Sequence, residues 1–242
     1  MKDRTAIVTG GTGALGRKIV IKLADEGVKV YVPARNLDDF NSVFDNSGDE
    51  NASDFKLRRI YSFVCNASDE NSVKEFVKNV YVQEKGRIDF LVNTVGGIGP
   101  VSFVADIESS ELDRMIDLNL KSAFYFSREA LKIMKINKYG RIISIGAMAA
   151  LDTSPGRFAY SFAKAGVINL MNTISEESKG ENIRCNTIVP SVIDTPANRE
   201  WGSDEEMKKW VKPEEIANIV YSLISDKFSS VRNSVIKVYG AL

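Results

Sequence analysis

The sequence predicts an α/β fold in which a doubly wound parallel sheet of about seven strands carries helices on both faces. Three observations predict it. Short runs rich in valine and isoleucine recur along the chain, segments with helical apolar spacing separate them, and most of the runs are continuously apolar. Continuous apolar runs indicate strands buried on both faces, and alternation with helices makes such strands parallel through right-handed crossovers. Since 242 residues suffice for one substantial core, residues 1–242 are predicted to form a single domain.

The elements can be placed along the chain from these patterns. The strand candidates are residues 5–8, 28–32, 59–64, 90–92, 141–145, 183–189 and 235–238. The helix candidates, with apolar spacing near 3.6, are residues 15–26, 72–85, 111–134, 159–177 and 213–225. Two polar stretches interrupt the alternation. Residues 38–55 are interpreted as a surface excursion between strands, and residues 194–210 as a mobile cover over a cleft.

Composition excludes several classes of function. Lys and Arg number 32, as do Asp and Glu, so no global field favours nucleic acid or a membrane as a partner. The chain has no histidine, which removes Ser-His-Asp and Cys-His catalysis and nearly every zinc pattern that uses histidine, and no metal site is predicted. The first apolar run is too short for a signal peptide or a membrane span, so a cytoplasmic location is expected. Cys65 and Cys185 lie in apolar runs and are predicted to be buried thiols.

A glycine-rich turn follows the first strand candidate directly. It reads Thr9-Gly10-Gly11-Thr12-Gly13-Ala14-Leu15-Gly16, and a helical pattern comes next. Glycines let the backbone turn sharply and approach a pyrophosphate, while the exposed amides and the helix dipole face the anion. The arrangement predicts a Rossmann-type dinucleotide site. The predicted contacts are Gly10, Thr12, Gly13, Ala14, Leu15 and Gly16. The alternative is a plain tight turn, for which four glycines in seven residues would be costly in chain entropy.

The end of the second strand candidate indicates which dinucleotide is bound. NAD-binding domains carry an acid there that accepts from the ribose hydroxyls. This chain has Ala34 at that position and Arg35 beside it, which offers a guanidinium to a 2′-phosphate and no carboxylate to repel one. The sequence therefore favours NADP as the cofactor over NAD. The alternative is that Arg35 is an ordinary surface residue.

Tyr160 and Lys164 are the candidate catalytic pair. They are four residues apart within a predicted helix and so share a face. A tyrosine hydroxyl with a pKa near 10 is a poor acid or base at neutral pH, but an adjacent ammonium favours the phenolate. The alternative is a partly buried tyrosine beside a lysine whose stem lies along the surface.

With these residues in place, the chain resembles the short-chain dehydrogenase/reductase family along almost its whole length. Thr9, Gly10, Ala14 and Gly16 match the family pattern Thr-Gly-x-x-x-[Ala/Gly]-x-Gly. The resemblance implies a Rossmann-type fold and hydride transfer between NADPH and a small carbonyl substrate. It also implies that Tyr160 and Lys164 contact the cofactor as well as the substrate.

The resemblance implies further cofactor contacts. Asn66 and Ala67 stand where the family has an adenine-contacting Asp-Val, and Asn93 and Gly96 preserve the first Asn and the Gly of Asn-Asn-Ala-Gly. Ile193 and Thr195 keep their places in a loop that contacts the nicotinamide carboxamide, although Ser191 replaces a glycine there. These residues are Asn66, Ala67, Asn93, Gly96, Ile193 and Thr195.

Asn119 corresponds to a helix asparagine that helps to hold a proton-relay water in the family, and it is therefore assigned to the catalytic set with Tyr160 and Lys164. Its alternative role is to bond the local backbone.

One departure from the family concerns its catalytic serine. That serine lies thirteen residues before the tyrosine, where this chain has Ala147; Ser144 lies nearby but is not assigned to catalysis. Losing one preorganised donor costs on the order of a hundredfold to a thousandfold in rate. Thr153 or Ser154 could substitute, the substrate could need less polarisation, or the protein could be a cofactor-binding regulatory protein without catalysis.

Two narrower resemblances bear on the substrate. The residues before Tyr160 are similar to dihydropteridine reductases, which reduce a quinonoid ring without that serine, whereas the rest of the chain resembles 3-oxoacyl-acyl-carrier-protein reductases. The hydride acceptor is therefore expected to be a carbonyl compound or, alternatively, an imine or a quinonoid ring. The family also implies a homo-oligomer, a tetramer or a dimer, formed through residues 111–134, 159–177 and the last strand. A module that uses an apolar patch for interaction would bind no dinucleotide at all.

Overall fold

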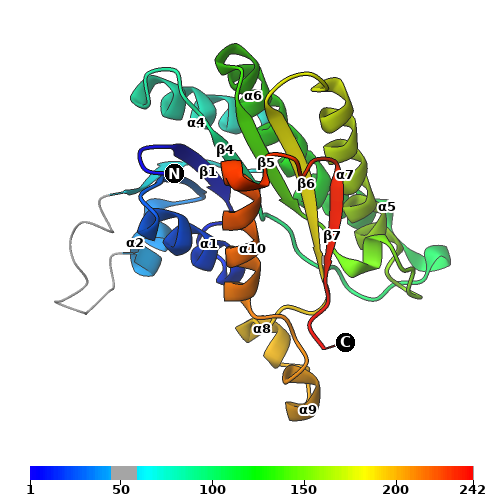
Figure 1. The fold of residues 1–242 in the computed structure, drawn as a ribbon. Coiled ribbons are helices and arrows are strands. Elements are labelled where there is room, and N and C mark those ends of the chain that lie inside the picture. The colour runs from blue at the N-terminus through cyan, green and yellow to red at the C-terminus, as the bar shows by residue number, and fades with distance from the viewer. Residues whose placement is uncertain (45–58, 242) are drawn as a thin grey trace.

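The computed structural model describes residues 1–44 and 59–241, which form a seven-stranded parallel sheet between two layers of helices (Figure 1). The strand order is β3-β2-β1-β4-β5-β6-β7, and every neighbouring pair is parallel. The strands are β1 (Thr5–Thr9), β2 (Lys29–Ala34), β3 (Ile60–Val64), β4 (Phe90–Asn93), β5 (Gly140–Ile145), β6 (Ile183–Pro190) and β7 (Ser234–Val238). The predicted doubly wound α/β fold is confirmed.

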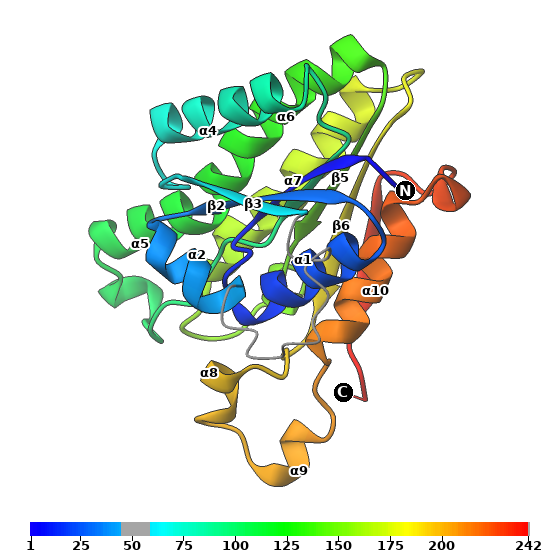
Figure 2. The same ribbon diagram turned by 90° about the vertical axis from the view of Figure 1, so that its left-hand side faces the viewer.

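Helices cover both faces of the sheet (Figures 1 and 2). One layer consists of α1 (Ala14–Asp25), α2 (Leu37–Phe44) and α10 (Pro213–Ile224), and the other of α4 (Glu70–Gln83), α6 (Ser122–Asn137) and α7 (Phe158–Glu177), with α5 (Ser109–Ile116) beside α7. Each face has its own apolar core. Leu23 and Val220 belong to the first core, and Phe76, Phe126 and Met171 to the second.

Short helical segments complete the described chain. They are 3₁₀ turns at Val104–Asp106, Met148–Ala150 and Asp226–Phe228, a π-helical turn at Asp117–Lys121, and the helices α8 (Pro196–Arg199) and α9 (Asp204–Met207). No helix within residues 1–44 and 59–241 is both long and apolar enough to span a bilayer. Cys65 and Cys185 are buried free thiols, as predicted.

The order of the strands reverses beside β1, which pairs with β2 on one side and with β4 on the other. In open parallel sheets, ligands bind outside the carboxyl ends of the strands at such a reversal. The loops after β1, β4, β5 and β6 therefore converge at one edge of the sheet. The predicted site residues lie at or after the ends of β1, β2, β3, β4 and β6, or on the π-helical turn and α7.

The predicted helix over residues 111–134 is divided in the structure. It consists of α5, the π-helical turn at Asp117–Lys121, and α6. A π turn inserts one extra residue into an α-helix and commonly occurs at functional sites. Here it contains Asn119, whose Nδ2 donates to the carbonyl of Met115 at 3.2 Å. The apolar spacing on either side hides the insertion.

The two polar stretches contain more helix than predicted. Residues 37–44 form α2, because Phe40 and Phe44 contact each other with ring centroids 5.0 Å apart and pack against the core. The remainder of the predicted excursion, residues 45–55, lies outside the described residues. Residues 194–210, predicted to be a cover, contain α8 and α9 and extend below the sheet in Figure 1. Whether this segment moves stays a prediction.

Candidate active site

The glycine turn after β1 has the backbone geometry of an anion-binding loop. Gly10 has φ of 65°, and its carbonyl accepts from the N–H of Gly13 at 3.0 Å. A methyl group on Gly16 would lie 2.1 Å from the Gly10 oxygen, so no larger residue fits at position 16. The tight turn therefore depends on the close contact between the backbone at Gly16 and the carbonyl of Gly10.

The beginning of α1 leaves its amides available to a ligand. Gly13 is the N-cap, no side chain caps the helix, and the first turn contains no acid. Gly13 and Ala14 are exposed, while Thr12 and Leu15 are half-buried. Uncapped N–H groups and the positive end of the helix dipole suit a phosphate, so these residues fit the pyrophosphate of a dinucleotide.

The residues predicted for the adenosine end lie at the ends of β2 and β3. Ala34 is buried, and Arg35 is exposed immediately after it. The Oδ1 atom of Asn66 accepts from the N–H of Ser68 at 3.1 Å, so only its second lone pair remains for an adenine amine. Ala67 is half-buried and packs against the core on the α4 side.

Asn93, predicted to contact the cofactor, turns its side chain into the protein. Its Nδ2 donates to the hydroxyls of Ser127 on α6 and Ser144 on β5, at 3.0 and 3.1 Å. The residue is buried at the end of β4. The amide nitrogen joins β4 to β5 and α6, while Oδ1 has no hydrogen-bond partner in the described part of the chain, and the contact of Asn93 with the cofactor stays a prediction.

Lys164, Asn119 and Gly96 lie together, although Lys164 comes from α7 and Asn119 from the π turn. A methyl group on Gly96 would lie 2.6 Å from Oδ1 of Asn119 and 2.8 Å from Nζ of Lys164. The amide of Asn119 accepts from the N–H of Gly97 and donates to its carbonyl, both at 3.1 Å. The local backbone role of Asn119 is thus present in the structure, while its part in catalysis with Tyr160 and Lys164 stays a prediction.

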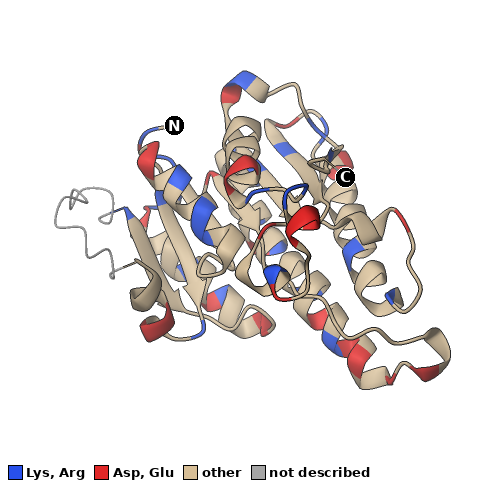
Figure 3. Cartoon of the chain, turned by 90° about the horizontal axis from the view of Figure 1, so that it is seen from below, with Lys and Arg blue, Asp and Glu red and all other residues tan. Residues whose placement is uncertain are grey.

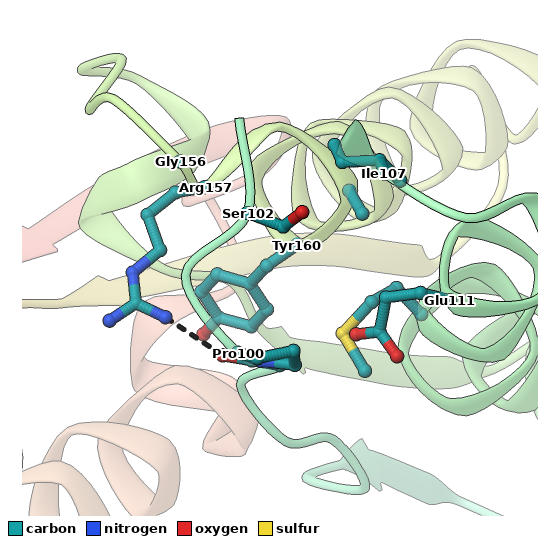
Figure 4. Close-up of a pocket in the computed structure, with 10 residues that line it drawn as sticks. Pro100, Ser102, Ile107, Glu111, Gly156, Arg157 and Tyr160 are labelled. Carbon is teal, nitrogen blue, oxygen red and sulfur yellow. Dashed lines mark hydrogen bonds between the residues drawn. The ribbon is translucent and has the colours of Figure 1, made fainter. Parts of the chain in front are cut away.

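Tyr160 lines a narrow pocket between α7 and the segment after β4 (Figure 4). The other side chains in view include Glu111 from α5 and Arg157 from the residue before α7. The free space is about 10 Å³, which is room for roughly one water molecule.

The electrostatics of Tyr160 differ from the prediction. Burial raises the pKa of Tyr160 to about 12, and the Arg157 cation opposes that rise. Lys164 is buried, donates from Nζ to the Ile145 carbonyl at 3.0 Å, and has its own pKa lowered by burial to about 8. The expected depression of the tyrosine pKa by Lys164 is therefore not found in this structure. The reason is that the ammonium is directed at a backbone carbonyl.

None of the hydroxyls expected to replace the missing serine lies in the described pocket, where Ser102 is the serine that lines it. Ala147 is buried just after β5. The hydroxyl of Ser144 accepts from Asn93 and donates to Sδ of Met171 at 3.2 Å, which supports leaving Ser144 out of catalysis. Thr153 and Ser154 are exposed and do not line the pocket of Tyr160.

Arg157 is the polar residue that the sequence reasoning missed. Its position three residues before Tyr160, at the start of a helix, was the available signal, because residues three apart share a helix face. In the structure, Nη1 of Arg157 donates to the carbonyl of Gly99 at 2.8 Å. The basic side chain thus reaches the same pocket as the tyrosine.

The loop after β6 is anchored on both sides. Ile193 forms a parallel bridge with Val211, and Thr195 caps α8 by accepting from the N–H of Asn198 at 3.3 Å. The hydroxyl of Ser191 donates to the carbonyl of Tyr239 at 3.0 Å. Ile193 and Thr195 are half-buried beside the cleft edge of β6, where a contact with the nicotinamide stays a prediction. Among the described residues, no group of three or more acids or cysteines is arranged to hold a metal ion.

Similarity to known proteins extends over the whole chain. The chain is 29% identical over 250 residues to a 3-oxoacyl-[acyl-carrier-protein] reductase of Thermotoga maritima, and the alignment covers 100% of this chain and 98% of the relative. It is 28% identical over 255 residues to a 7alpha-hydroxysteroid dehydrogenase of Bacteroides fragilis, covering 100% and 95%. The crystal structure of gox2181 superposes with a TM-score of 0.89 at 26% identity, covering 99% of this chain and 95% of that one.

A family profile for the short chain dehydrogenases matches residues 4–206. That match includes the glycine turn, the π turn with Asn119, and the helix carrying Tyr160 and Lys164. Members of this family are oxidoreductases that bind a nicotinamide dinucleotide, and the loop geometry here suits one. Because the match covers most of the chain and contains the residues that carry the chemistry, this protein belongs to the short chain dehydrogenase family.

Proposed function

We propose that residues 1–242 form one catalytic domain that reduces the carbonyl group of a small molecule with NADPH, and that Tyr160 is the proton donor. The observation that carries the proposal is the position of Tyr160, which is half-buried one helical turn before Lys164 on α7 and lines the pocket beside the segment after β4. A tyrosine with a pKa near 12 is protonated at neutral pH. It is thus ready to donate a proton, which is what a reduction requires.

Tyr160, Lys164 and Asn119 have different roles in the proposed proton transfer. The bound cofactor supplies hydride to the carbonyl carbon. Tyr160 gives its proton to the oxygen that receives the electron pair of the carbonyl. Lys164 would hold the nicotinamide ribose and return a proton to Tyr160 from solvent. Asn119 holds Gly97 and lies beside Lys164, so that this relay keeps its geometry.

Several similarities guide the class of substrate. The relative from Thermotoga maritima is named as a reductase of 3-oxoacyl-[acyl-carrier-protein], which favours a ketone as the acceptor. Ala147 favours a substrate that needs less polarisation, such as an imine or a quinonoid ring. A panel of simple ketones, 3-oxoacyl thioesters and quinonoid pterins therefore covers the proposal.

Replacing Tyr160 by Phe tests the proposal directly. The variant loses the acidic proton but keeps the ring, so kcat/KM should fall by at least about a hundredfold, the lower range for a positioned general acid. Fluorescence of bound NADPH should give a Kd within about twofold of the wild-type value. The matched control is Tyr221→Phe, which removes a hydroxyl that bonds Glu26 on the opposite layer. Turnover retained in Tyr160→Phe would refute the assignment.

Arg35 supports NADPH over NADH. It is exposed just after β2, and the strand ends in Ala34 without a carboxylate. A charge-assisted contact is worth about 1.5–3 kcal/mol, which corresponds to roughly a tenfold to hundredfold change in affinity. In Arg35→Ala the KM for NADPH should rise by about that factor while the KM for NADH stays within twofold. Equal changes for both cofactors would contradict the preference.

The competing function is that of a regulatory protein that binds the dinucleotide without turning it over. Ala147 is the residue that favours it, because a donor to the substrate oxygen is absent at that position. Such a protein would show saturable NADPH fluorescence and no oxidation with any member of the panel. Steady-state absorbance of NADPH separates the two functions.

The assembly and location of the protein are also proposed. We infer a homo-oligomer, a tetramer or a dimer, that uses α5, α6, α7 and β7. The supporting observation is that Phe124 on α6 and Phe158 and Phe162 on α7 remain exposed on these helices. The location is proposed to be cytoplasmic, and neither nucleic acid nor a membrane is proposed as a partner.

A further inference from the structure

The segment that follows β4 lies across the pocket of Tyr160. Two hydrogen bonds attach it to the start of α7: Nη1 of Arg157 donates to the Gly99 carbonyl at 2.8 Å, and the N–H of Ser102 donates to the Gly156 carbonyl at 3.0 Å. A methyl group on Gly156 would lie 2.4 Å from Cγ1 of Val101, so the two segments are in close contact. Since the pocket holds about one water molecule, residues 99–102 must withdraw before a substrate can enter from this side.

Arg157 is placed to act in the same pocket as Tyr160. It is the residue immediately before α7, one turn ahead of the tyrosine, and both side chains line the pocket (Figure 4). Residues three apart share a helix face, so withdrawal of residues 99–102 leaves the guanidinium and the phenol facing the same space.

The hydrogen bond that Arg157 makes in this structure leaves most of its N–H donors without a protein acceptor in the described part of the chain. A guanidinium has five N–H donors and carries a permanent charge, yet the bond made by Arg157 in the described part of the chain is to one neutral carbonyl. Glu111, the acid lining the same pocket, is occupied by Arg114, which donates to it from Nε and Nη2 at 2.8 and 2.9 Å. Arg157 therefore keeps unused donors beside Tyr160.

The pocket also needs a donor. A carbonyl oxygen that receives an electron pair during hydride transfer is stabilised by preorganised donors. Ala147 offers none, and the hydroxyl of Ser144 is directed into the core. Ser102 brings a neutral hydroxyl to the pocket, which carries no charge to balance a developing oxyanion. Among the described pocket residues, the guanidinium of Arg157 is the cationic donor next to the proton donor.

We propose that Arg157 binds the reacting oxygen of the substrate together with Tyr160, at the position that the carbonyl of Gly99 occupies in this structure. The inference rests on the proposed function. Hydride forms the new C–H bond, the carbonyl electron pair moves to oxygen, the guanidinium holds the developing negative charge, and Tyr160 supplies the proton. Arg157 stays protonated throughout, and it selects acceptors whose reacting oxygen becomes strongly anionic.

The kinetic test replaces Arg157 by Gln and by Lys. Removing one donor to a developing oxyanion should lower kcat about a hundredfold in R157Q, while R157K, which keeps the charge and a donor, should retain part of the rate. Because the Arg157 cation opposes the raised pKa of Tyr160, R157Q should also move the alkaline rise of alcohol oxidation to higher pH. The other ionisable groups near the phenol, Glu111 and Lys164, are unchanged in both variants. A kcat within threefold of the wild type in R157Q would overturn the inference.

The binding test is independent of turnover. Butyrate serves as the probe in the presence of NADP⁺, because its carboxylate resembles the anionic oxygen, and calorimetry gives its Kd. R157Q should weaken butyrate by at least about tenfold, the factor expected for one charged hydrogen bond. Equal affinity in wild type and R157Q, or no binding to the wild type, would overturn the inference. If R157Q does not fold, as judged by its thermal melt, R157K decides the question with the same probe.

A control separates oxygen binding from mere anchoring of the segment. Ser102→Pro removes the N–H that donates to Gly156, together with the Ser102 hydroxyl in the pocket, and loosens residues 99–102 without changing Arg157. Butyrate should bind this variant at least as well as the wild type. Equal weakening in Ser102→Pro and R157Q would show that Arg157 only anchors the segment. A wild-type protein that binds NADPH but reduces no acceptor would defeat the proposed function alone, since the butyrate titration would still decide the role of Arg157.

Discussion

Tyr160 has a cation on each side along α7, and the two cations act differently. Arg157 lies in the same pocket and lowers the pKa of the phenol, whereas Lys164 is directed at the Ile145 carbonyl and is itself destabilised as a cation by burial. The spacing of Tyr160 and Lys164 could be predicted from sequence because one helical turn separates them. The direction of the ammonium could not, because Ile145 comes from β5, nineteen residues earlier.

The raised pKa of Tyr160 predicts opposite pH dependences for the two directions of reaction. As pH rises from 6 to 10 the phenol keeps its proton, because its pKa is about 12, but Lys164, with a pKa of about 8, loses the proton that it returns to the phenol. The rate of reduction should therefore stay level below about pH 8 and fall above it. Oxidation of the alcohol needs the phenolate, so its rate should rise by up to about tenfold per pH unit over the same range. Steady-state rates in both directions measure this, with Tyr160→Phe as the blank. An oxidation rate that is independent of pH would contradict the prediction.

Asn93 illustrates why some site residues could not be predicted. The sequence identified it correctly as a polar residue at the end of a buried strand. Its partners, Ser127 and Ser144, are 34 and 51 residues away along the chain, and no local pattern reveals that they approach it. A polar residue at a strand end can face the cleft or the interior, and only tertiary contacts decide which.

At the scale of the element, the strands and most helices lie within a few residues of their predicted bounds, because the apolar pattern that buries each strand and each helix face is local. The π turn and α2 were missed for different reasons. The turn at Asp117–Lys121 adds a residue without interrupting the apolar spacing. In α2, two phenylalanines pack on the core within a run of Asn, Asp and Ser whose composition favours loops.

The glycine turn gives a prediction at this scale. In Gly16→Ala the new methyl would lie 2.1 Å from the Gly10 carbonyl, so the turn must open and the amides of α1 lose their alignment. The Kd for NADPH should rise at least about fivefold, since such overpacking costs about 1–3 kcal/mol. Fluorescence titration measures it. The control is Gly180→Ala, which strains the backbone at φ of 85° but places no atom within 4 Å of the new methyl, so it should lower stability without raising the Kd for NADPH. Unchanged affinity in Gly16→Ala would contradict a phosphate site in the turn.

At the scale of the whole molecule, basic and acidic residues are interspersed over the same helices and loops (Figure 3). This distribution agrees with equal totals of 32 for each sign. The exposed side chains that suggest contact with another protein subunit are apolar and not charged. Phe162, with 49% of its surface exposed, stacks on Phe158 with ring centroids 5.8 Å apart on the outer side of α7.

The exposed phenylalanines predict the outcome of a charge substitution. In Phe162→Glu, a carboxylate would have to be buried in the proposed interface, so the oligomer should dissociate toward the 26.8 kDa monomer. Size-exclusion chromatography with light scattering measures the mass. Val82→Glu on α4 is the control, since Val82 is 68% exposed on a helix outside the proposed interface. A wild-type protein that is monomeric at micromolar concentration would contradict the proposal.

The amide of Asn119 pairs with both backbone groups of Gly97, and so joins the loop after β4 to the junction between α5 and α6. Those helices are the ones proposed to meet a second subunit. A second subunit that shifts this surface would therefore also shift the side chain of Asn119 and, through it, the loop beside Lys164. Specific activity should consequently fall on dilution before circular dichroism registers any loss of helix.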